Sequence, residues 1–256
     1  MSNDATLRAL HDAPTLFVVV NVWDVASAHA VAAVDGIEAL ATASHSIAAA
    51  HGFPDGEHIP LDLHLAAVER IAAAVDLPLS MDMESGYGDP GETARRAIAA
   101  GAVGANLEDR AGPLEAAVAA VDAVIAAGEA AGVDFVLNAR TDVVLKPPAP
   151  MTADAALEDA IVRGRAFLEA GATCVFVPGV KERGAIERLV AGIGDRSISV
   201  LAGPGALPIS ELEALGVARA SLGPFSYRAA LTALQDVASG LLAGGTLPAS
   251  VRADVV

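Results

Sequence analysis

The sequence predicts a parallel α/β fold, the eight-stranded (β/α)8 or TIM barrel, on three observations. The chain has 256 residues, a common size for one such barrel, and 54% of them are hydrophobic. Short apolar runs recur along it without polar alternation, which is typical of strands buried on both faces of a parallel sheet. An Ala-rich helical pattern follows each run, so strand and helix alternate eight times.

The strand-like runs and the helices between them can be placed by residue number. We expect strands at 16–24, 39–46, 78–85, 102–109, 134–142, 173–179, 197–203 and 218–224. Helical patterns follow at 27–36, 61–75, 92–101, 113–131, 153–170, from 182, at 209–215 and onward to 244. Ser27 is the predicted cap of the first helix. No composition shift marks a linker, so residues 1–256 are predicted to form one barrel domain, with a doubly wound open sheet as the competing architecture.

Composition excludes several classes of function. The net charge of −16 argues against nucleic acid, whose phosphates need a basic surface. The single cysteine, Cys174, excludes an intramolecular disulfide and a multi-cysteine zinc site and suits a reducing compartment. The first fifteen residues lack the apolar core of a signal peptide, and no uncharged apolar run has the length of a membrane helix. We therefore expect a cytoplasmic protein with no membrane partner.

Two acids end the third predicted strand, in the stretch LPLSMDMESGYG at 77–88. Asp82 and Glu84 are two residues apart, so in a strand they point to the same face. The chain then breaks at Gly86 and Gly88. Two like charges at the mouth of a sheet repel each other unless a cation or a shared proton lies between them. A solvated loop with incidental acids is the alternative.

Other polar residues collect at the ends of neighbouring strands, where a barrel of this type carries its site. They are Asn21, Trp23, Asp24, Ser44, His45, Ser46, Asn106, Glu108, Asp109, Asn138, Arg140, Thr141 and Asp142. Convergence of Asp82, Glu84 and Glu108 would require a hard divalent cation, and oxygen ligands favour Mg²⁺ or Mn²⁺. The guanidinium of Arg140 suits a substrate carboxylate or phosphonate, or else it neutralises the acids as a structural ion pair.

Six segments together resemble the isocitrate lyase and phosphoenolpyruvate mutase superfamily. They appear in the order typical of that family and span residues 21 to 223. They are NVWDVASA, TASHSIAAAHGFPD, PLSMDMESGYG, GAVGANLEDR, FVLNARTD and ALGVARASLG. The D-x-E-S-G-Y-G, G-x-N-L-E-D and N-A-R-T-D patterns are specific in combination.

The resemblance implies a (β/α)8 barrel that swaps its last helix within a homotetramer or homodimer. It also implies a Mg²⁺-dependent enzyme that cleaves or rearranges a C–C or P–C bond in a small 2-oxo or 2-hydroxy acid. By position, Asp82 matches the direct metal ligand, and Glu84, Glu108 and Asp55 match acids that hold the metal through water. Arg140 matches the residue that grips the far carboxylate or phosphonate.

The remaining predicted site residues follow from position in the chain. The backbone of Ser44 and His45 matches the loop that receives the substrate carboxylate, although members often carry Ser-Gly there. His45 is the candidate base, with a structural histidine as the alternative, and it joins Arg140 and Asp55 in the predicted catalytic set. Trp23 is the predicted wall of the substrate site, unless it belongs to the core.

One departure from the family affects the expected reaction. Members carry a gating loop between the fourth and fifth strands, with a Lys-Cys-Gly-His-like segment in lyases and Lys and Asn in mutases. Here 108–120, EDRAGPLEAAVAA, runs straight into a helix and contains no Cys, His, Lys or Asn. The connection after the second strand, with His51 and His58, is a possible cover. We expect a lyase that works by decarboxylation or retro-aldol cleavage; P–C chemistry and a non-catalytic ligand-binding protein are the alternatives.

Overall fold

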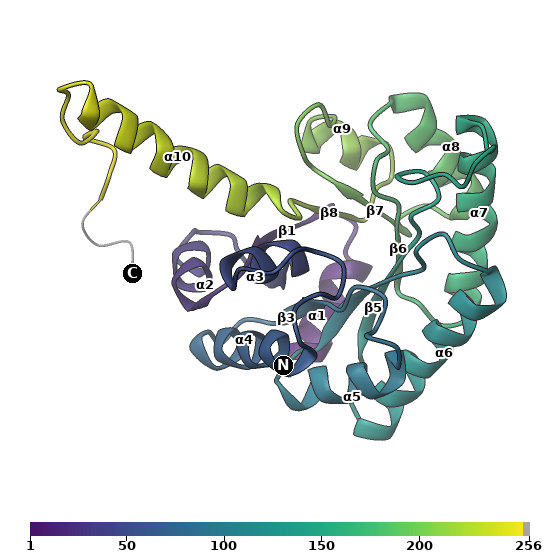
Figure 1. The fold of residues 1–256 in the computed structure, drawn as a ribbon. Helices are drawn as coiled ribbons and strands as arrows, with labels where there is room; N and C mark the ends of the chain where they lie inside the picture. Colours follow the sequence, from purple (N-terminus) through teal and green to yellow (C-terminus); the bar gives the residue numbers. More distant parts are fainter. Residues whose placement is uncertain (253–256) are drawn as a thin grey trace.

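The computed structural model, which describes residues 1–252, contains a closed barrel of eight parallel strands in sequence order (Figure 1). The strands are β1 (Phe17–Val22), β2 (Leu40–Thr42), β3 (Leu79–Asp82), β4 (Gly104–Glu108), β5 (Val136–Arg140), β6 (Cys174–Phe176), β7 (Ile198–Leu201) and β8 (Arg219–Ser221). β1 pairs in parallel with β8 and so closes the ring. The predicted (β/α)8 barrel is confirmed, and the alternative of an open sheet is wrong.

Each strand lies within its predicted run but is shorter than that run. β2, for example, occupies only Leu40–Thr42 of the predicted 39–46. Residues are lost at both ends, and at the carboxyl ends the polar residues belong to loops or to the next helix. These ends all open at one mouth, because every strand in the ring has the same direction.

Helices surround the barrel (Figure 1). They are α1 (Asn3–Asp12), α2 (Val25–Ala32), α3 (Ser44–Ala50), α4 (Leu61–Ala74), α5 (Pro90–Ala99), α6 (Leu114–Ala131), α7 (Ala153–Glu169), α8 (Arg183–Ile193), α9 (Ile209–Ala214) and α10 (Phe225–Leu242). α1 and α3 fall outside the eightfold repeat of strand and helix. Ser44 and His45, predicted to end a strand, instead begin α3.

The first repeat helix begins earlier than the sequence predicted. Its N-cap is Asp24, whose carboxylate accepts a bond from the Ser27 backbone N–H at 2.7 Å. The Ser27 hydroxyl in turn accepts from the Asp24 N–H at 3.0 Å, which completes a capping box. The prediction of Ser27 as the cap is therefore wrong, because Ser27 is the third residue of the box and supports the true cap.

α1 covers the N-terminal end of the barrel. Leu7 is buried against Phe17 and Val136, the first residues of β1 and β5. A Cβ added to Gly104, the first residue of β4, would lie 2.8 Å from the Leu7 side chain, so only glycine permits this close approach. With this end closed, the carboxyl-terminal mouth is left for a ligand.

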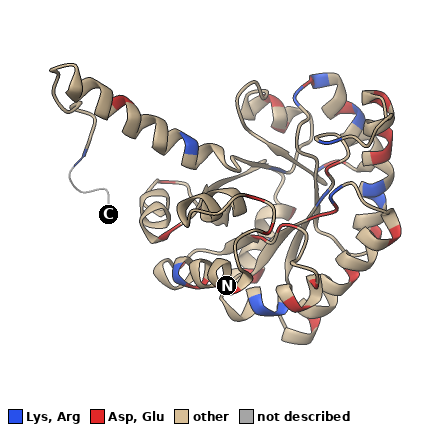
Figure 2. Cartoon of the chain, in the orientation of Figure 1, with Lys and Arg blue, Asp and Glu red and all other residues tan. Residues whose placement is uncertain are grey.

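α10 leaves the barrel and projects from its side (Figure 1). The helix buries none of its residues, although Leu231, Leu234 and Leu241 recur at helical spacing and are each at least 41% exposed. Acidic residues are spread over the outer helices, in agreement with the net charge (Figure 2). Among residues 1–252, no helix combines the length and apolar character needed to cross a membrane.

The buried His11 of α1 predicts a pH dependence of folding stability. Its Nδ1 lies 2.9 Å from the Leu7 carbonyl, and burial together with Arg219 lowers its pKa from 6.5 to about 3. The folded protein therefore disfavours the charged ring, so the contribution of His11 is complete above pH 6.5 and is lost as pH falls towards 3. We expect a loss of about 1.4 kcal/mol of unfolding free energy per pH unit in that window.

Urea unfolding at pH 7.5 and pH 5 would test this expectation with the variant His11→Gln. The variant should be less stable at pH 7.5 but should lose less stability on acidification than the native chain. His29→Gln, at an exposed position of α2, is the matched control. Equal acid sensitivity of the native chain and His11→Gln would contradict the assignment.

Candidate active site

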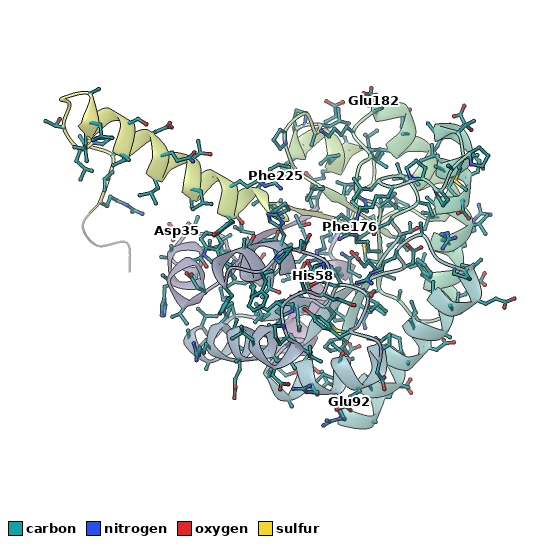
Figure 3. The ribbon with its side chains drawn as sticks, in the orientation of Figure 1. Asp35, His58, Glu92, Phe176, Glu182 and Phe225 are labelled. Atoms are coloured by element: carbon teal, nitrogen blue, oxygen red, sulfur yellow. The ribbon has the colours of Figure 1, made fainter. Side chains whose placement is uncertain are left out.

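A cavity of about 260 Å³ opens at the carboxyl-terminal mouth of the barrel. Side chains from seven of the eight strands line it, and the segment after β2 completes the ring. The lining residues are Asn21, Ala43, Ser44, His45, Asp55, Asp82, Asn106, Arg140, Leu145, Lys146, Phe176, Pro178, Leu201, Ser221, Gly223, Pro224 and Arg228. Phe176 is labelled near the centre of the ring in Figure 3. Seven strands and the segment after β2 thus form a single concave site, as expected for this fold.

Asp82 stands at the end of β3 and is fixed by neighbours from β2 and α3. One of its carboxylate oxygens accepts from the Ser44 backbone N–H at 3.0 Å and from the Ser44 hydroxyl at 2.8 Å. Its own N–H donates to the Thr42 hydroxyl at 2.9 Å. The second carboxylate oxygen meets only the Glu84 N–H, at a long 3.4 Å. That oxygen is therefore available to a ligand in the cavity.

Glu84 lies behind Asp82 in a buried network with the loop that follows α3. Its carboxylate accepts from the Glu57 N–H at 2.5 Å and from the Tyr87 hydroxyl at 3.2 Å. Burial, reinforced by Asp82 and Asp55, raises the pKa of Glu84 to about 7. Asp82 and Glu84 are thus close enough to repel each other. The prediction that they share one face of a strand is wrong, because β3 ends at Asp82 and Glu84 has a positive φ.

Glu57 holds the two loops together. Its carboxylate accepts from the Ser85 N–H and hydroxyl and from the Tyr87 N–H, at 2.7 to 3.1 Å, and pairs with Arg110 at 2.9 Å. Burial opposes this charge, but the hydrogen bonds and Arg110 outweigh it and lower the pKa of Glu57.

Backbone strain gathers in these same loops. Six non-glycine residues of 1–252 have positive φ, and five of them lie here: Glu57, Glu84, Tyr87, Arg110 and Ala111. Such conformations cost about 1–3 kcal/mol each and typically mark functional regions.

Glu108 and Arg140, facing residues of β4 and β5, form the opposite side of the acidic group. Arg140 donates to Glu108 at 3.0 Å and to Asp142 at 2.7 Å. Burial, with Asp142 and Asp82, raises the pKa of Glu108 to about 7 although Arg140 opposes the rise. Burial also opposes the charge of Arg140, but the two carboxylates outweigh it and raise the pKa of Arg140. The guanidinium is therefore both ion-paired and part of the cavity wall.

The structure brings some predicted site residues together and places others elsewhere. Ser44, His45, Asp55, Asp82 and Arg140 line the cavity, and the His45 ring lies 3.7 Å from the Asp55 carboxylate. Glu84 and Glu108 stand beside Asp82 but do not line the cavity. Trp23, the predicted wall, lines a separate groove with His51 and Arg70 and stacks edge-on against Tyr227. The role of Trp23 in binding substrate stays a prediction, and the place of Trp23 outside the cavity does not support it.

Three charged residues of the site were missed by sequence reasoning. Glu57 lies two residues beyond Asp55, in the loop already singled out. Lys146 lies in the loop after β5, and Arg228 lies in the first turns of α10; both line the cavity. No motif identifies these two. The only available signal was their position after the carboxyl ends of strands 5 and 8.

The residues present fit a hard divalent cation. Asp82 offers a carboxylate oxygen to the cavity, and burial together with neighbouring acids raises the pKa of both Glu84 and Glu108 to about 7, so added positive charge would stabilise their ionised forms. Within residues 1–252, no three His, Cys, Asp or Glu side chains are close enough to enclose a metal directly. This donor set therefore fits Mg²⁺ held by one protein carboxylate and by waters, rather than a closed cage.

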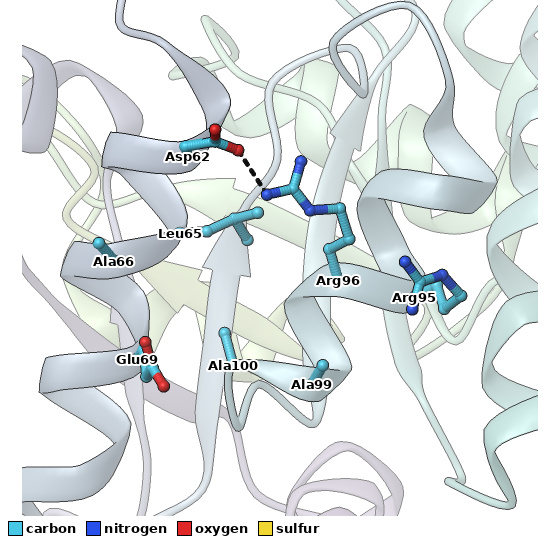
Figure 4. Close-up of a pocket in the computed structure, with 8 residues that line it drawn as sticks. All are labelled: Asp62, Leu65, Ala66, Glu69, Arg95, Arg96, Ala99 and Ala100. Atoms are coloured by element: carbon cyan, nitrogen blue, oxygen red, sulfur yellow. Dashed lines mark hydrogen bonds and ion pairs between the residues drawn. The ribbon is translucent and has the colours of Figure 1, made fainter.

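A second cavity lies outside the barrel between α4 and α5 (Figure 4). It holds about 380 Å³, but both of its arginines are committed: Arg96 pairs with Asp62, and Arg95 pairs with Glu92, each at 2.6 Å. It is an open groove between helices with no strained or orphaned polar group. The mouth of the barrel is the better candidate for chemistry.

Comparison with known proteins identifies the family of this chain. The profile of the Phosphoenolpyruvate phosphomutase family matches residues 7–242. The 2-methylisocitrate lyase of Escherichia coli K12 is 30% identical over 230 residues, covering 82% of this chain and 75% of its own. The oxaloacetate decarboxylase of Rhodopseudomonas palustris BisB18 is 30% identical over 209 residues, covering 78% and 71%.

Solved structures show the same relationship. A Burkholderia cenocepacia J2315 protein with a provisional assignment as a phosphonomutase is 39% identical, with a TM-score of 0.85, covering 95% of this chain and 98% of its own. A phosphonopyruvate hydrolase solved with oxalate and Mg²⁺ is 25% identical, with a TM-score of 0.82, covering 96% and 89%. The chain belongs to the phosphoenolpyruvate phosphomutase family, within the isocitrate lyase and phosphoenolpyruvate mutase superfamily.

Proposed function

We propose that this protein is a Mg²⁺-dependent lyase that cleaves a C–C bond in a small 2-oxo or 2-hydroxy dicarboxylic acid. The proposal depends on one observation: an available carboxylate oxygen of Asp82 and the guanidinium of Arg140 both line one cavity of about 260 Å³. One end of such a cavity suits a cation, and the other suits an anion. The family includes lyases and mutases, and 108–120 lacks the Cys, His, Lys and Asn of the gating loop in both. We favour a lyase because decarboxylation, in which CO₂ leaves without a general base, does not need those residues.

Asp82 would hold Mg²⁺ directly, and Glu84, Glu108 and Asp55 would hold its waters. When bound, the metal would act as a Lewis acid that lowers the energy of negative charge on the substrate oxygen. The oxalate and Mg²⁺ found in the related phosphonopyruvate hydrolase support this choice of cofactor.

The residues of the chain supply binding and alignment. Arg140 binds the far carboxylate, and its bonds to Glu108 and Asp142 keep the guanidinium plane fixed. A fixed far end aligns the breaking C–C bond with the carbonyl π system, which is the part of catalysis due to orientation. Phe176, Pro178 and Leu201 exclude water beside that bond. Decarboxylation then needs no base, whereas retro-aldol cleavage would need His45 to accept the hydroxyl proton.

P–C bond chemistry is the second candidate. It is favoured by the family profile and by the 39% identical Burkholderia cenocepacia structure. The same Arg140 would then bind a phosphonate. A ligand-binding protein without turnover is the remaining alternative.

We further propose that the chain assembles with copies of itself through α10. This helix exposes Leu231, Leu234 and Leu241 while burying none of its own residues, which leaves an apolar face for a second copy to cover. A homodimer or a homotetramer fits, and the buried free Cys174 suits a cytoplasmic location.

The metal assignment can be tested without turnover. Asp82→Asn keeps the size of the side chain but removes its charge. We expect Mg²⁺ affinity measured by calorimetry to fall by more than about tenfold, the lower end of what even an outer-shell partner contributes. Asp62→Asn, on the exposed side of α4, is the control. Unchanged affinity in Asp82→Asn would exclude Asp82 as the ligand.

A substrate panel with Mg²⁺ and with EDTA tests the reaction class. Oxaloacetate, isocitrate, methylisocitrate, malate derivatives, phosphonopyruvate and phosphoenolpyruvate would be followed by NMR. We expect EDTA-sensitive cleavage of a C–C bond in one dicarboxylic acid. Cleavage of a P–C bond would favour the second candidate, and binding without turnover of any compound would favour the binding protein.

Arg140→Lys tests the far-end contact with less disturbance than removal of the charge. We expect the KM of the dicarboxylic substrate to rise about 10- to 100-fold, as loss of a charge-assisted bidentate contact implies. The dissociation constant of pyruvate, which has no far carboxylate, should change little. Equal effects on both compounds would make Arg140 a purely structural ion pair.

The assembly can be tested with Leu234→Glu, which places a charge on the exposed face of α10. Light scattering coupled to gel filtration should show a shift to a smaller species, with the circular dichroism spectrum unchanged. Thr232→Glu, at an exposed position on the opposite face of the same helix, adds the same charge and is the control. A native chain that is already monomeric would overturn the proposal.

A further inference from the structure

Lysine is rare in this chain and one lysine lies at the proposed site. The sequence has only two lysines, Lys146 and Lys181, against fourteen arginines. Lys146 lines the same cavity as Asp82 and Arg140. Lys181 lies outside that cavity and donates to the Pro204 carbonyl at 2.7 Å. Because a guanidinium does not give up its proton in proteins whereas an ammonium can, the one lysine on the wall differs in kind from its two arginines.

The segment that carries Lys146 is anchored at both sides. The Lys146 N–H donates to the Asp142 carbonyl at 2.8 Å, and the Asp142 side chain is held by Arg140. Leu145 packs closely against the loop after β6, since a Cβ added to Gly179 would lie 3.3 Å from the Leu145 Cα. Within the described chain the Lys146 ammonium makes no hydrogen bond or ion pair, so it is available to a ligand.

The two sides of the cavity differ in chemistry. Asp82, Ser44, His45 and Asp55 come from the β2 and β3 side and face the proposed metal. Lys146 comes from the β5 side, next to apolar side chains of β6 and β7, Phe176 and Leu201. A substrate held by Asp82 at its 2-oxo acid end and by Arg140 at its far end would occupy the cavity that Lys146 also lines.

Bond cleavage leaves an electron pair that must be quenched by a proton. Of the polar side chains on the wall, only His45 and Lys146 combine a releasable proton with freedom from the proposed metal shell. His45 is already turned towards Asp55, at 3.7 Å. The segment 108–120 contains no Cys, His or Lys, and its Glu108 belongs to the proposed metal shell.

We propose that Lys146 is the proton donor to the enolate carbon, an inference that rests on the proposed function. As the C–C bond breaks, its electron pair moves into the enolate and the far carboxylate departs as CO₂ in the case of decarboxylation. The enolate carbon then forms a C–H bond with a proton from the Lys146 ammonium while the carbonyl re-forms. The neutral amine recovers its proton from water, so charge and atoms balance.

The decisive variant is Lys146→Arg, which keeps the positive charge but removes the ability to donate a proton. Two readouts are needed. One is Mg²⁺-dependent cleavage of the substrate identified by the panel. The other is exchange of the methyl hydrogens of pyruvate with D₂O, followed by NMR with Mg²⁺ present, which uses the same donor in reverse but breaks no C–C bond.

We expect Lys146→Arg to lower both kcat and the exchange rate by about 100-fold, the lower end of what general acid–base catalysis contributes. KM should change by less than about threefold, because a cation remains to meet the anionic substrate. Lys146→Gln should lose activity and also raise KM. Lys181→Gln, the matched control, should retain both rates. Lys146 is exposed, so none of these variants should disturb the fold.

The outcomes separate this inference from the proposed function. If the native protein cleaves a C–C bond and Lys146→Arg retains both rates, the Lys146 assignment is wrong and the lyase stands. If His45→Gln rather than Lys146→Arg abolishes exchange, the donor is His45. If the native protein shows neither cleavage nor exchange across the panel, the proposed function and the inference both fall.

Discussion

The mouth of this barrel is organised around buried negative charge. Asp82, Glu84 and Glu108 meet there because parallel strands in a closed ring deliver all their carboxyl ends to one place. Burial and mutual repulsion raise the pKa of both glutamates to about 7. Such a group is stable only with a counter-charge, and the protein provides part of it through Arg140 and Arg110. The proposed Mg²⁺ would balance the negative charge that remains.

Hydrogen bonds and ion pairs fix the conformation of the loops around these acids. Glu57 joins the loop after α3 to the loop after β3 through four contacts. Asp109 does the same between β4 and β5, accepting from the Asp142 N–H at 3.0 Å and pairing with Arg163 of α7 at 2.9 Å. Positive φ angles at Glu84 and Arg110 add local strain. These contacts with the barrel therefore stabilise backbone conformations that the loops would not adopt on their own.

Much of this could be predicted from the sequence because the signals were local. Eight apolar runs, each followed by a helical pattern, determine a barrel. The period of a strand did not place Glu84 correctly, because β3 ends at Asp82 and Glu84 has a positive φ, so only Asp82 lines the cavity. The shape of the connection after β2 could not be predicted in this way. Ser44 and His45 begin a short helix whose only support is tertiary packing, as Ile47 and Ala48 are fully buried. Propensity is too weak to identify a seven-residue helix in an Ala-rich segment.

Lys146 and Arg228 could not be predicted as site residues for a different reason. Both lie on segments whose direction is set after the strand has ended, one by packing of Leu145 on Gly179 and the other by the departure of α10 from the barrel. Arg228 lies at the base of that helix, where its guanidinium stacks over Phe225 at 5.4 Å. Asp82 and Glu108 are thus the last residues of strands, whereas Lys146 and Arg228 lie on segments that follow a strand. A ligand that bridges these acids and cations would tie these segments to the barrel, so anion binding and order at the mouth should be linked.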